Sequence, residues 1–370
     1  MTAQSKPVTP DTFPFWKLPP LARSHVTRLM EQADVIHLSM HSKLFKRLLK
    51  AFKIGGVTIK FKVFCYPEEE DSEVFIETYY DKPYEYVELW CTHADCWSFP
   101  ENQHMLVHNN RMLVGKEGER FEVNSALTFQ EQMSTMEHLT RHLLEIFHVE
   151  HFELRYQHTK QNHIFDSFIW GIIDKFRFIV VNSYNAPEKE DSLSEEEIEN
   201  IDNLYGLTAE QTKFFFNEVK TDKLDFNAFI SNAEELTGIQ LKHREILFWN
   251  EDLLGLATID HLIDAESEEL WICFDDVEAD DIMELLEKWQ SGEKLTNLRR
   301  LNLSFVREDE HQPLIEMLEE LEDVEKCQRQ EADATGQRAY QVGPYTIRRT
   351  TDGKTATFHV SNAGLRFSCN

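Results

Sequence analysis

Two cysteines and a histidine lie close together in the stretch CTHADC, at Cys91, His93 and Cys96. Thiolate and imidazole groups are ligands that zinc prefers in proteins, so this cluster could contribute to a metal site. A closed structural site needs a fourth donor, and the sequence offers no second compact Cys/His pair to supply one. The stretch therefore does not predict a zinc site, and metal analysis of the pure protein would test the zinc-dependent enzyme that it would otherwise suggest.

Other motifs that could perform chemistry are incomplete. The stretch DGKT resembles the end of a phosphate-binding loop, but Arg348 stands where that loop needs its first glycine. His37 and His41 have helical spacing without the glutamate of a zinc-protease helix, so we expect them to face solvent. The sequence contains no nucleophile elbow and no glycine-rich dinucleotide motif. We therefore predict a protein that is not an enzyme and that holds no cofactor or metal.

The composition is that of a folded and strongly acidic chain. Of the 370 residues, 41% are hydrophobic and 12% aromatic, which is enough to build a sizeable core. A formal net charge of -28 repels phosphate backbones and argues against a nucleic-acid partner. No stretch approaches the roughly 20 apolar residues that a membrane span needs, so we expect no membrane partner. The six scattered cysteines are typical of reduced proteins, which indicates the cytoplasm or the nucleus.

Three short helices are predicted before Gly55. Pro19 and Pro20 are start signals for a helix over 20–33, because proline is tolerated in the first helical turn. Asp34 and Ser42 are predicted to cap the second and third helices, and Gly55-Gly56 to end the third. So small a unit is marginal alone. It is therefore either a helical cap on the next domain or a docking module that a partner stabilises.

The rest of the chain predicts an α/β fold. Alternation of apolar and polar residues indicates an antiparallel β-rich segment over 57–124, with a hairpin turn at 108–110, and a long helix over 128–147. Strands and helices then alternate, which favours a parallel sheet backed by helices in an irregular, degenerate leucine-rich-repeat-like arc. Asp352-Gly353 predicts a C-terminal β-hairpin. The predicted strands of the arc are 151–156, 176–181, 223–229, 269–275 and 299–305, and its helices are 165–174, 208–219, 258–265 and 277–290.

The N-terminal stretch LPPLARSHVTRLMEQADVIHLSMHSKLFKRLL resembles an F-box. It has Leu-Pro at the start of the first helix, a short apolar second helix, and a serine before the third helix. Its lead-in, FPFWKLPPLA, is similar to that of the large nematode-expanded F-box family. The resemblance implies an F-box over 13–54, and the polar residues 1–12, which contain two prolines, are predicted to be a flexible tail.

The remaining chain resembles the type-2 F-box-associated domain of the same family. LATIDHLIDAESEELWI is similar to its Thr-hydrophobic-Asp-His-Leu stretch, and DDIMELLEKWQSGEKLTNLRRLNL to its helix and Leu-Arg-x-Leu strand. YTIRRTTDGKTATFHV is similar to its closing hairpin. This resemblance implies a substrate-recognition domain over 55–370, with a β-rich part over 57–124, an α/β arc over 125–325 and a hairpin over 340–368.

The family resemblance implies a substrate-recognition subunit of a Skp–cullin–F-box ubiquitin ligase. The F-box would bind a Skp-type adaptor, which bridges to a cullin, and the C-terminal domain would hold a protein target for ubiquitination. Lysines and arginines outnumber acidic residues in 17–53, which suits an acidic adaptor through electrostatic steering; a solvated face is the alternative explanation of these charges. The predicted adaptor-binding residues are Leu18, Pro19, Leu21, Val26, Leu29, Val35, Leu38 and Leu48.

A target-binding face is predicted from the strands of the arc. If the Leu and Phe side chains of these strands point into the core, the intervening residues point outward. Trp and Arg are the residues that contribute most often to protein-binding hot spots. The predicted target-binding residues are Arg155, Arg177, Trp271, Arg300 and Asn302. Packing of Trp271 under a neighbouring loop is the alternative. An interaction or sensing scaffold that uses its F-box without ligase activity is the alternative function.

Overall fold

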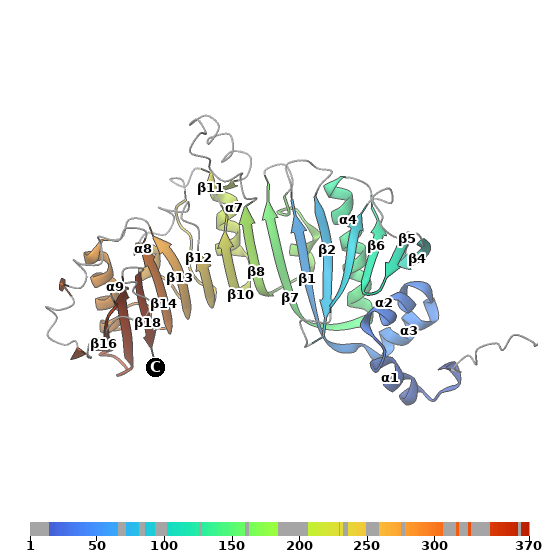
Figure 1. Cartoon of the computed structure of the whole chain (residues 1–370), viewed down its shortest axis with the longest axis horizontal. Helices are drawn as coiled ribbons and strands as arrows, with labels where there is room; N and C mark the ends of the chain where they lie inside the picture. The colour runs from blue at the N-terminus through green and yellow to red at the C-terminus, as the bar shows by residue number, and fades with distance from the viewer. Residues whose placement is uncertain are drawn as a thin grey trace, which may run out of the picture.

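The computed structural model describes most of the chain from residue 15 onward. It describes residues 15–65, 72–80, 86–92, 102–125, 128–159, 163–183, 206–228, 230–231, 236–248, 259–274, 278–305, 316–317, 325–326, 341–361 and 364–369. The fold is mixed α/β, as the sequence predicts: three short helices precede a 16-stranded mixed sheet with helices interspersed along the chain. Figure 1 shows the sheet as a long arc with the N-terminal helices at one end.

The N-terminal helices begin and end near the predicted positions. A 3-10 turn, η1 (Phe15–Lys17), precedes α1 (Pro20–Arg28), α2 (Gln32–His41) and α3 (Lys43–Phe52). Pro20 is the first residue of α1, and the Ser42 side chain caps α3 by accepting a hydrogen bond from the backbone of Phe45, both as predicted. Proline in the first turn lacks only an N–H that would have no intrahelical partner.

Three boundary predictions were wrong. The first helix ends at Arg28 instead of at residue 33. The second helix begins before Asp34, because Glu31 has the extended N-cap backbone, while the Asp34 carboxylate pairs with Lys116 at 3.1 Å. The third helix ends at Phe52 instead of at the glycine pair, and Lys53 leaves it with a φ of 35°. Gly55 and Gly56 lie inside the first strand at a register shift, where Gly56 adopts a φ of 80° that favours glycine.

The segment that the sequence predicts as antiparallel is mostly so. Its neighbours pair antiparallel except β3 with β6, which are parallel, and the hairpin between β4 and β5 turns at His108-Asn109 as predicted. Its strands are β1 (Ile54–Phe64), β2 (Glu73–Tyr79), β3 (Tyr86–Thr92), β4 (Asn102–Val107), β5 (Asn110–Glu117) and β6 (Arg120–Asn124).

The following strands form the predicted parallel arc. After α4 (Phe129–Ile146), β7 pairs parallel with β1 and joins both halves into one sheet. The next strands add successively at the other edge of β7, all parallel. They are β7 (Phe147–His158), β8 (Phe176–Ser183), β10 (Thr221–Asn227), β12 (Glu245–Phe248), β13 (Glu269–Phe274) and β14 (Arg300–Phe305). Strand β12 was not predicted from the sequence.

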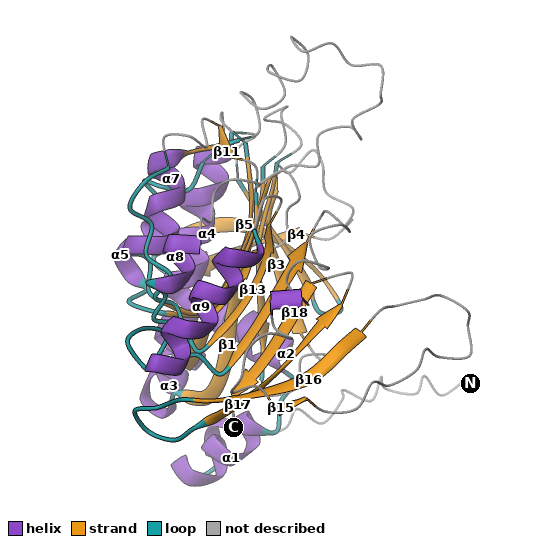
Figure 2. Ribbon diagram, turned by 90° about the vertical axis from the view of Figure 1, so that its left-hand side faces the viewer, coloured by secondary structure: helices purple, strands orange, loops and turns teal. Residues whose placement is uncertain are grey.

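Helices α5, α7, α8 and α9 of the arc all cover the same face of the sheet (Figure 2). They match the predicted helical segments: α5 (Phe168–Ile172), α7 (Ala209–Lys213) with the π-helical turn η4 (Phe214–Glu218), α8 (Ile259–Ile263) and α9 (Ala279–Ser291). A two-stranded sheet, β9 (Leu207–Thr208) with β11 (Ile230–Ser231), lies beside α7. We call the face opposite α5, α7, α8 and α9 the open face.

The C-terminal hairpin closes the far end of the sheet. The Asp352-Gly353 turn joins β16 (Gln341–Arg348) to β17 (Thr355–Ser361), as predicted, and the short β15 (Glu325–Lys326) pairs with β16. One further strand, β18 (Gly364–Cys369), pairs antiparallel with both β17 and β14 and so attaches the hairpin to the arc.

The N-terminal helices share the core of the sheet. Ile36 on α2 and Leu49 on α3 are completely buried in the same hydrophobic cluster as the strands, where these helices pack on α4 and β4. The packing of α2 and α3 fits the interpretation of a helical cap on the next domain, and α1 projects beyond it (Figure 1).

Candidate functional site

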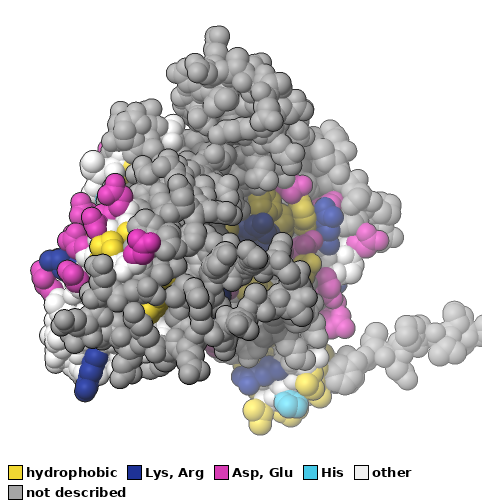
Figure 3. All heavy atoms as spheres, turned by 60° about the vertical axis from the view of Figure 1, so that its left-hand side comes forward, with side chains coloured by type: hydrophobic (Ala, Val, Ile, Leu, Met, Phe, Trp, Pro, Cys, Tyr) yellow, Lys and Arg dark blue, Asp and Glu magenta, His cyan; other side chains and the backbone are white. Residues whose placement is uncertain are grey.

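Exposed apolar side chains concentrate on the N-terminal helices. Among the described residues, the exposed large hydrophobic side chains are Trp16, Leu21, Leu29 and Leu44, and Tyr86 on β3. Leu21 and Leu29 are 84% and 75% exposed, the highest values of this set. Figure 3 shows hydrophobic side chains beside Lys and Arg at the projecting lower tip of the molecule, where Figures 1 and 2 place α1. Apolar surface gathered in this way is typical of protein–protein interaction sites.

The structure places the predicted adaptor-binding residues at different depths. Pro19, Leu21 and Leu29 are exposed, whereas Leu18, Val26, Leu38 and Leu48 are half-buried. Val35 is completely buried against the chain's own core, so its inclusion was wrong. It lies on the face of α2 that packs inward, and its apolar character serves the fold. Trp16 and Leu44 are exposed residues that the prediction omitted, and Leu44 lies one helical turn before Leu48 on α3.

The positive charge expected around this patch is largely present. The exposed cations are Lys17, Arg28, Lys43, Arg47, Lys50 and Lys53. Arg23 is half-buried, with its guanidinium 6.0 Å from the centre of the Trp16 ring. Lys46 is an exception, because its side chain is only 8% exposed and turns toward α4. Around α1 and α3 an acidic partner would therefore meet a basic and apolar surface.

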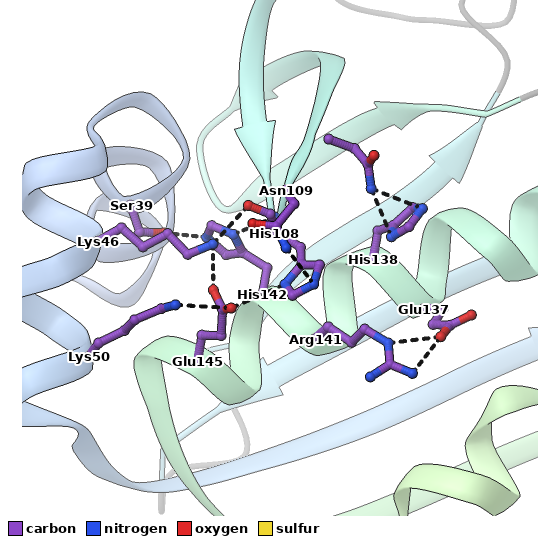
Figure 4. Close-up of polar contacts among 11 residues, drawn as sticks. Ser39, Lys46, Lys50, His108, Asn109, Glu137, His138, Arg141, His142 and Glu145 are labelled. Carbon is purple, nitrogen blue, oxygen red and sulfur yellow. Dashed lines mark hydrogen bonds and ion pairs between the residues drawn. The ribbon is translucent and has the colours of Figure 1, made fainter.

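Lys46 belongs to a polar junction that fixes α3 to α4 (Figure 4). The Glu145 carboxylate on α4 accepts from Lys46 at 2.5 Å and from Lys50 at 3.0 Å, and His108 Nδ1 lies 3.2 Å from it. Lys46 also donates to the backbone carbonyl of His108 at 2.9 Å. Burial raises the pKa of Glu145, but the hydrogen bonds from the two lysines outweigh it and hold that pKa below its ordinary value.

Ser39 and His142 form a second, fully buried contact in this junction (Figure 4). Ser39 Oγ lies 2.7 Å from His142 Nε2, a distance typical of a nucleophile and its base. However, His142 Nδ1 accepts from the backbone N–H of His108, so Nε2 carries the ring proton and donates it to Ser39. The Ser39 hydroxyl in turn donates to the Ile36 carbonyl at 2.6 Å. This pair is arranged to hold α2 on α4, with no base for the serine.

Four of the five predicted target-binding residues lie on the open face. Strand pairing puts Arg155, Trp271 and Asn302 in one row across the sheet, and Arg300 in the row beside it. Their neighbours Leu154, Leu270 and Leu301 are buried toward the helices, as the alternation predicted. Arg155 is exposed, Trp271 and Asn302 are half-buried, and Arg300 lies 3.5 Å from Glu269.

Arg177 reaches this region from the edge of the sheet. It lies at the beginning of β8 and lines a shallow cavity of about 480 Å³ with Glu153, Lys223 and Glu269. The alternation predicted for β8 was wrong, because Ile179 and Val181 are the buried residues while Phe178 and Val180 lie on the open face. Phe178 packs under the Lys223 ammonium, 5.4 Å away, which explains an aromatic residue on a charged face.

Part of the rejected metal cluster lies outside the described residues. Cys91 is buried in β3, and burial raises its pKa, whereas His93 and Cys96 are not described. Within the described ranges, no three His, Cys, Asp or Glu side chains gather as a metal site would require. His41 is exposed as expected, but His37 is half-buried and packs 6.3 Å from the Phe121 ring. None of the described helices is long and apolar enough to cross a membrane.

No family model, curated protein or solved structure matches this chain. A functional assignment therefore depends on the residues and the geometry described above.

Proposed function

We propose that the chain is a non-catalytic substrate-recognition subunit of a Skp–cullin–F-box ubiquitin ligase. In this proposal α1, α2 and α3 form the F-box, which docks a Skp-type adaptor, and residues 55–370 form a type-2 F-box-associated domain that binds a protein target. The concentration of exposed apolar side chains on and beside α1, surrounded by Lys and Arg, is the observation that carries the proposal. The succession of parallel strands with helices on one face supports a leucine-rich-repeat-like arc.

The arrangement suits a rigid connector. The Lys46–Glu145 and Ser39–His142 contacts fix α2 and α3 to α4, and α4 packs on β2, β3 and β7. A partner held on α2 and α3 therefore stands at a defined position relative to the sheet. In this proposal the chain itself transfers no ubiquitin. It determines where a bound target lies relative to the Skp-type adaptor.

Leu21→Asp is expected to abolish adaptor binding while leaving the fold intact. Leu21 is 84% exposed, so the free energy of unfolding should change by no more than about 0.5 kcal/mol. A charge in the centre of an apolar interface should weaken capture of a purified Skp-type adaptor by about 30-fold or more. Leu18→Ala with Pro19→Ala should also weaken capture.

Tyr86→Asp is the matched control, since Tyr86 is the exposed large hydrophobic residue among those described that lies outside the helices. It should capture the adaptor as the wild type does. Unchanged capture by Leu21→Asp would contradict the docking assignment. Co-purification of a cullin with the adaptor would separate a ligase subunit from an F-box scaffold without ligase activity, because only the former recruits the cullin.

Trp271→Ala combined with Arg300→Ala is expected to reduce target binding. Both side chains lie on the open face, and Trp and Arg side chains contribute strongly to protein interfaces. The measurement compares the proteins that co-purify with the wild type and with the double variant when the proteasome is blocked. The prediction is met by proteins that accumulate when the proteasome is blocked and that co-purify with the double variant at least about fivefold less than with the wild type. An identical set, with the variant folded, would exclude this face.

A further inference from the structure

A cavity of about 810 Å³ lies between the end of α1 and the neighbouring ends of β2, β3 and β6. Its volume falls within the range of small-ligand sites. We call it the α1–β3 groove. Apolar side chains form part of its lining: Leu29 and Tyr86 are exposed, Met30 is half-buried, and Val87 is buried. Two of the few exposed large hydrophobic residues thus face one cavity from different elements.

The other lining residues are mainly acidic. Glu31, Glu88, Glu117 and Glu119 line the groove, against two arginines, Arg28 and Arg120. The Arg120 guanidinium pairs with Glu122 at 2.9 Å and lies 4.4 Å from the Trp90 ring, so its charge is largely compensated. Burial is the main cause that raises the pKa of Glu119, and repulsion from the nearby Glu31 carboxylate raises it further. The groove therefore favours a cation, in contrast to the basic surface around α1.

A buried amide provides independent support for a ligand with hydrogen-bond donors. Gln32, at the beginning of α2, lines the groove and is only 6% exposed. Its Nε2 donates to Thr78 Oγ1 at 2.9 Å, and its Oε1 has no hydrogen-bond partner in the part of the chain that is described. An unused acceptor at a buried position is costly. A donor from a ligand would satisfy it.

We propose that the α1–β3 groove binds a Lys or Arg side chain of the target protein together with an adjacent apolar side chain. The stem of a long cation can lie on Met30 and Tyr86, while its donors reach Gln32 Oε1 and the Glu119 carboxylate. Glu88 and Arg120 begin a register row that continues through Glu77 to Glu153 on the open face. The groove is thus continuous with the predicted target face, and its assignment to the target rests on the proposed function.

The test uses the purified full-length chain without an adaptor. The probe is an acetylated hexapeptide library with Leu or Tyr fixed at the third position and Lys, Arg, Gln or Glu at the fifth. The chain should retain Lys and Arg peptides at least about tenfold more strongly than Glu peptides. Glu119→Lys should remove or invert this preference, and Tyr86→Ala should weaken retention of all members, while Tyr86→Phe keeps it.

Glu287→Lys is the matched control for net charge. Glu287 is exposed on α9, outside the groove, and the substitution changes the net charge as Glu119→Lys does. It should leave the peptide preference unchanged. Equal loss in both variants would mean general attraction to an acidic chain and would overturn the proposal, as would equal retention of Lys and Glu peptides. If the chain forms dimers and Tyr86→Ala dissociates them, the groove binds a second copy of the chain. That result would also overturn the proposal.

Leu21→Asp separates this inference from the proposed function. The variant should lose adaptor capture and keep the preference for basic peptides. If the wild type selects basic peptides but binds no adaptor, the ligase assignment is contradicted. The groove would then still be a site for basic peptide segments. Adaptor binding without selectivity would contradict the groove alone.

Discussion

Glu145→Gln is expected to lower the free energy of unfolding by about 3 kcal/mol, because it leaves a nearly buried ammonium without its counter-charge. The Lys46 side chain is 8% exposed, and besides its ion pair with Glu145 it donates a hydrogen bond to the backbone carbonyl of His108. An amide can accept from Lys46 but cannot compensate its charge. Lys50 and His108 lose the same carboxylate. Urea unfolding of the purified chain measures the change.

The loss should be greatest in the N-terminal helices, since Glu145 is where α3 meets α4. We expect hydrogen exchange to accelerate in α2 and α3 before it does so in the strands. Glu137→Gln provides the control on the same helix. Glu137 pairs with Arg141 at 2.7 Å, but both side chains are substantially exposed, and such a pair contributes about 0.5 kcal/mol. Similar small effects of both substitutions would show that the junction does not hold the helices.

Local patterns predicted the elements well because they are properties of neighbouring residues. Pro20 and Ser42 act within one helical turn, and Asp352-Gly353 fixes a hairpin through the backbone of the turn itself. Alternation also placed Trp271 and Asn302 on the open face, because the buried leucines beside them leave one orientation. Element boundaries depended on distant partners: Asp34 lies within α2 and pairs with Lys116 on β5.

The groove and the junction were not predictable in the same way. Their residues come from segments far apart in the chain: Gln32 meets Thr78, Ser39 meets His142, and Lys46 meets Glu145. The apolar periodicity of α2 included Val35. Periodicity alone does not distinguish an apolar residue that a partner covers from one that is buried in the chain's own core. One sequence signal could have indicated the junction: Lys46 stands at an inward-facing position of α3, and a buried lysine requires a counter-charge.

Acidification from pH 7 to pH 5 is expected to lower the free energy of unfolding by about 4 kcal/mol through two buried histidines. Burial, followed by the charge of Lys46, lowers the pKa of His142 to about 3. Burial, followed by the charge of His163, lowers the pKa of His158 to about 3 as well. Both rings are completely buried, and Tyr156 Oη lies 2.6 Å from His158 Nδ1.

The direction follows from where the protons bind. With an ordinary pKa of 6.5, the unfolded chain takes up a proton at each histidine as the pH falls below that value, whereas the folded chain does not until about pH 3. Each histidine therefore removes up to about 1.4 kcal/mol per pH unit, a slope that is reached only well below pH 6.5, and about 2 kcal/mol in all between pH 7 and pH 5. Carboxylates with a lowered pKa, such as Glu145, lose their contribution only below the window. Glu73 and Asp225, whose pKa burial raises, act in the opposite direction toward its lower end.

His142→Gln isolates one of the two contributions. Its amide can still donate to Ser39, although the acceptor for the His108 N–H is lost, so the variant is less stable at pH 7. Its stability should nevertheless decline more slowly on acidification, with the slope between pH 6 and pH 5 reduced by about 1.4 kcal/mol per unit in urea titrations. His151→Gln, at an exposed position on β7, should keep the wild-type slope. A slope that His142→Gln leaves unchanged would mean that this ring is protonated in the folded chain, and the Ser39–His142–His108 hydrogen bonds could not then have the directions assigned to them.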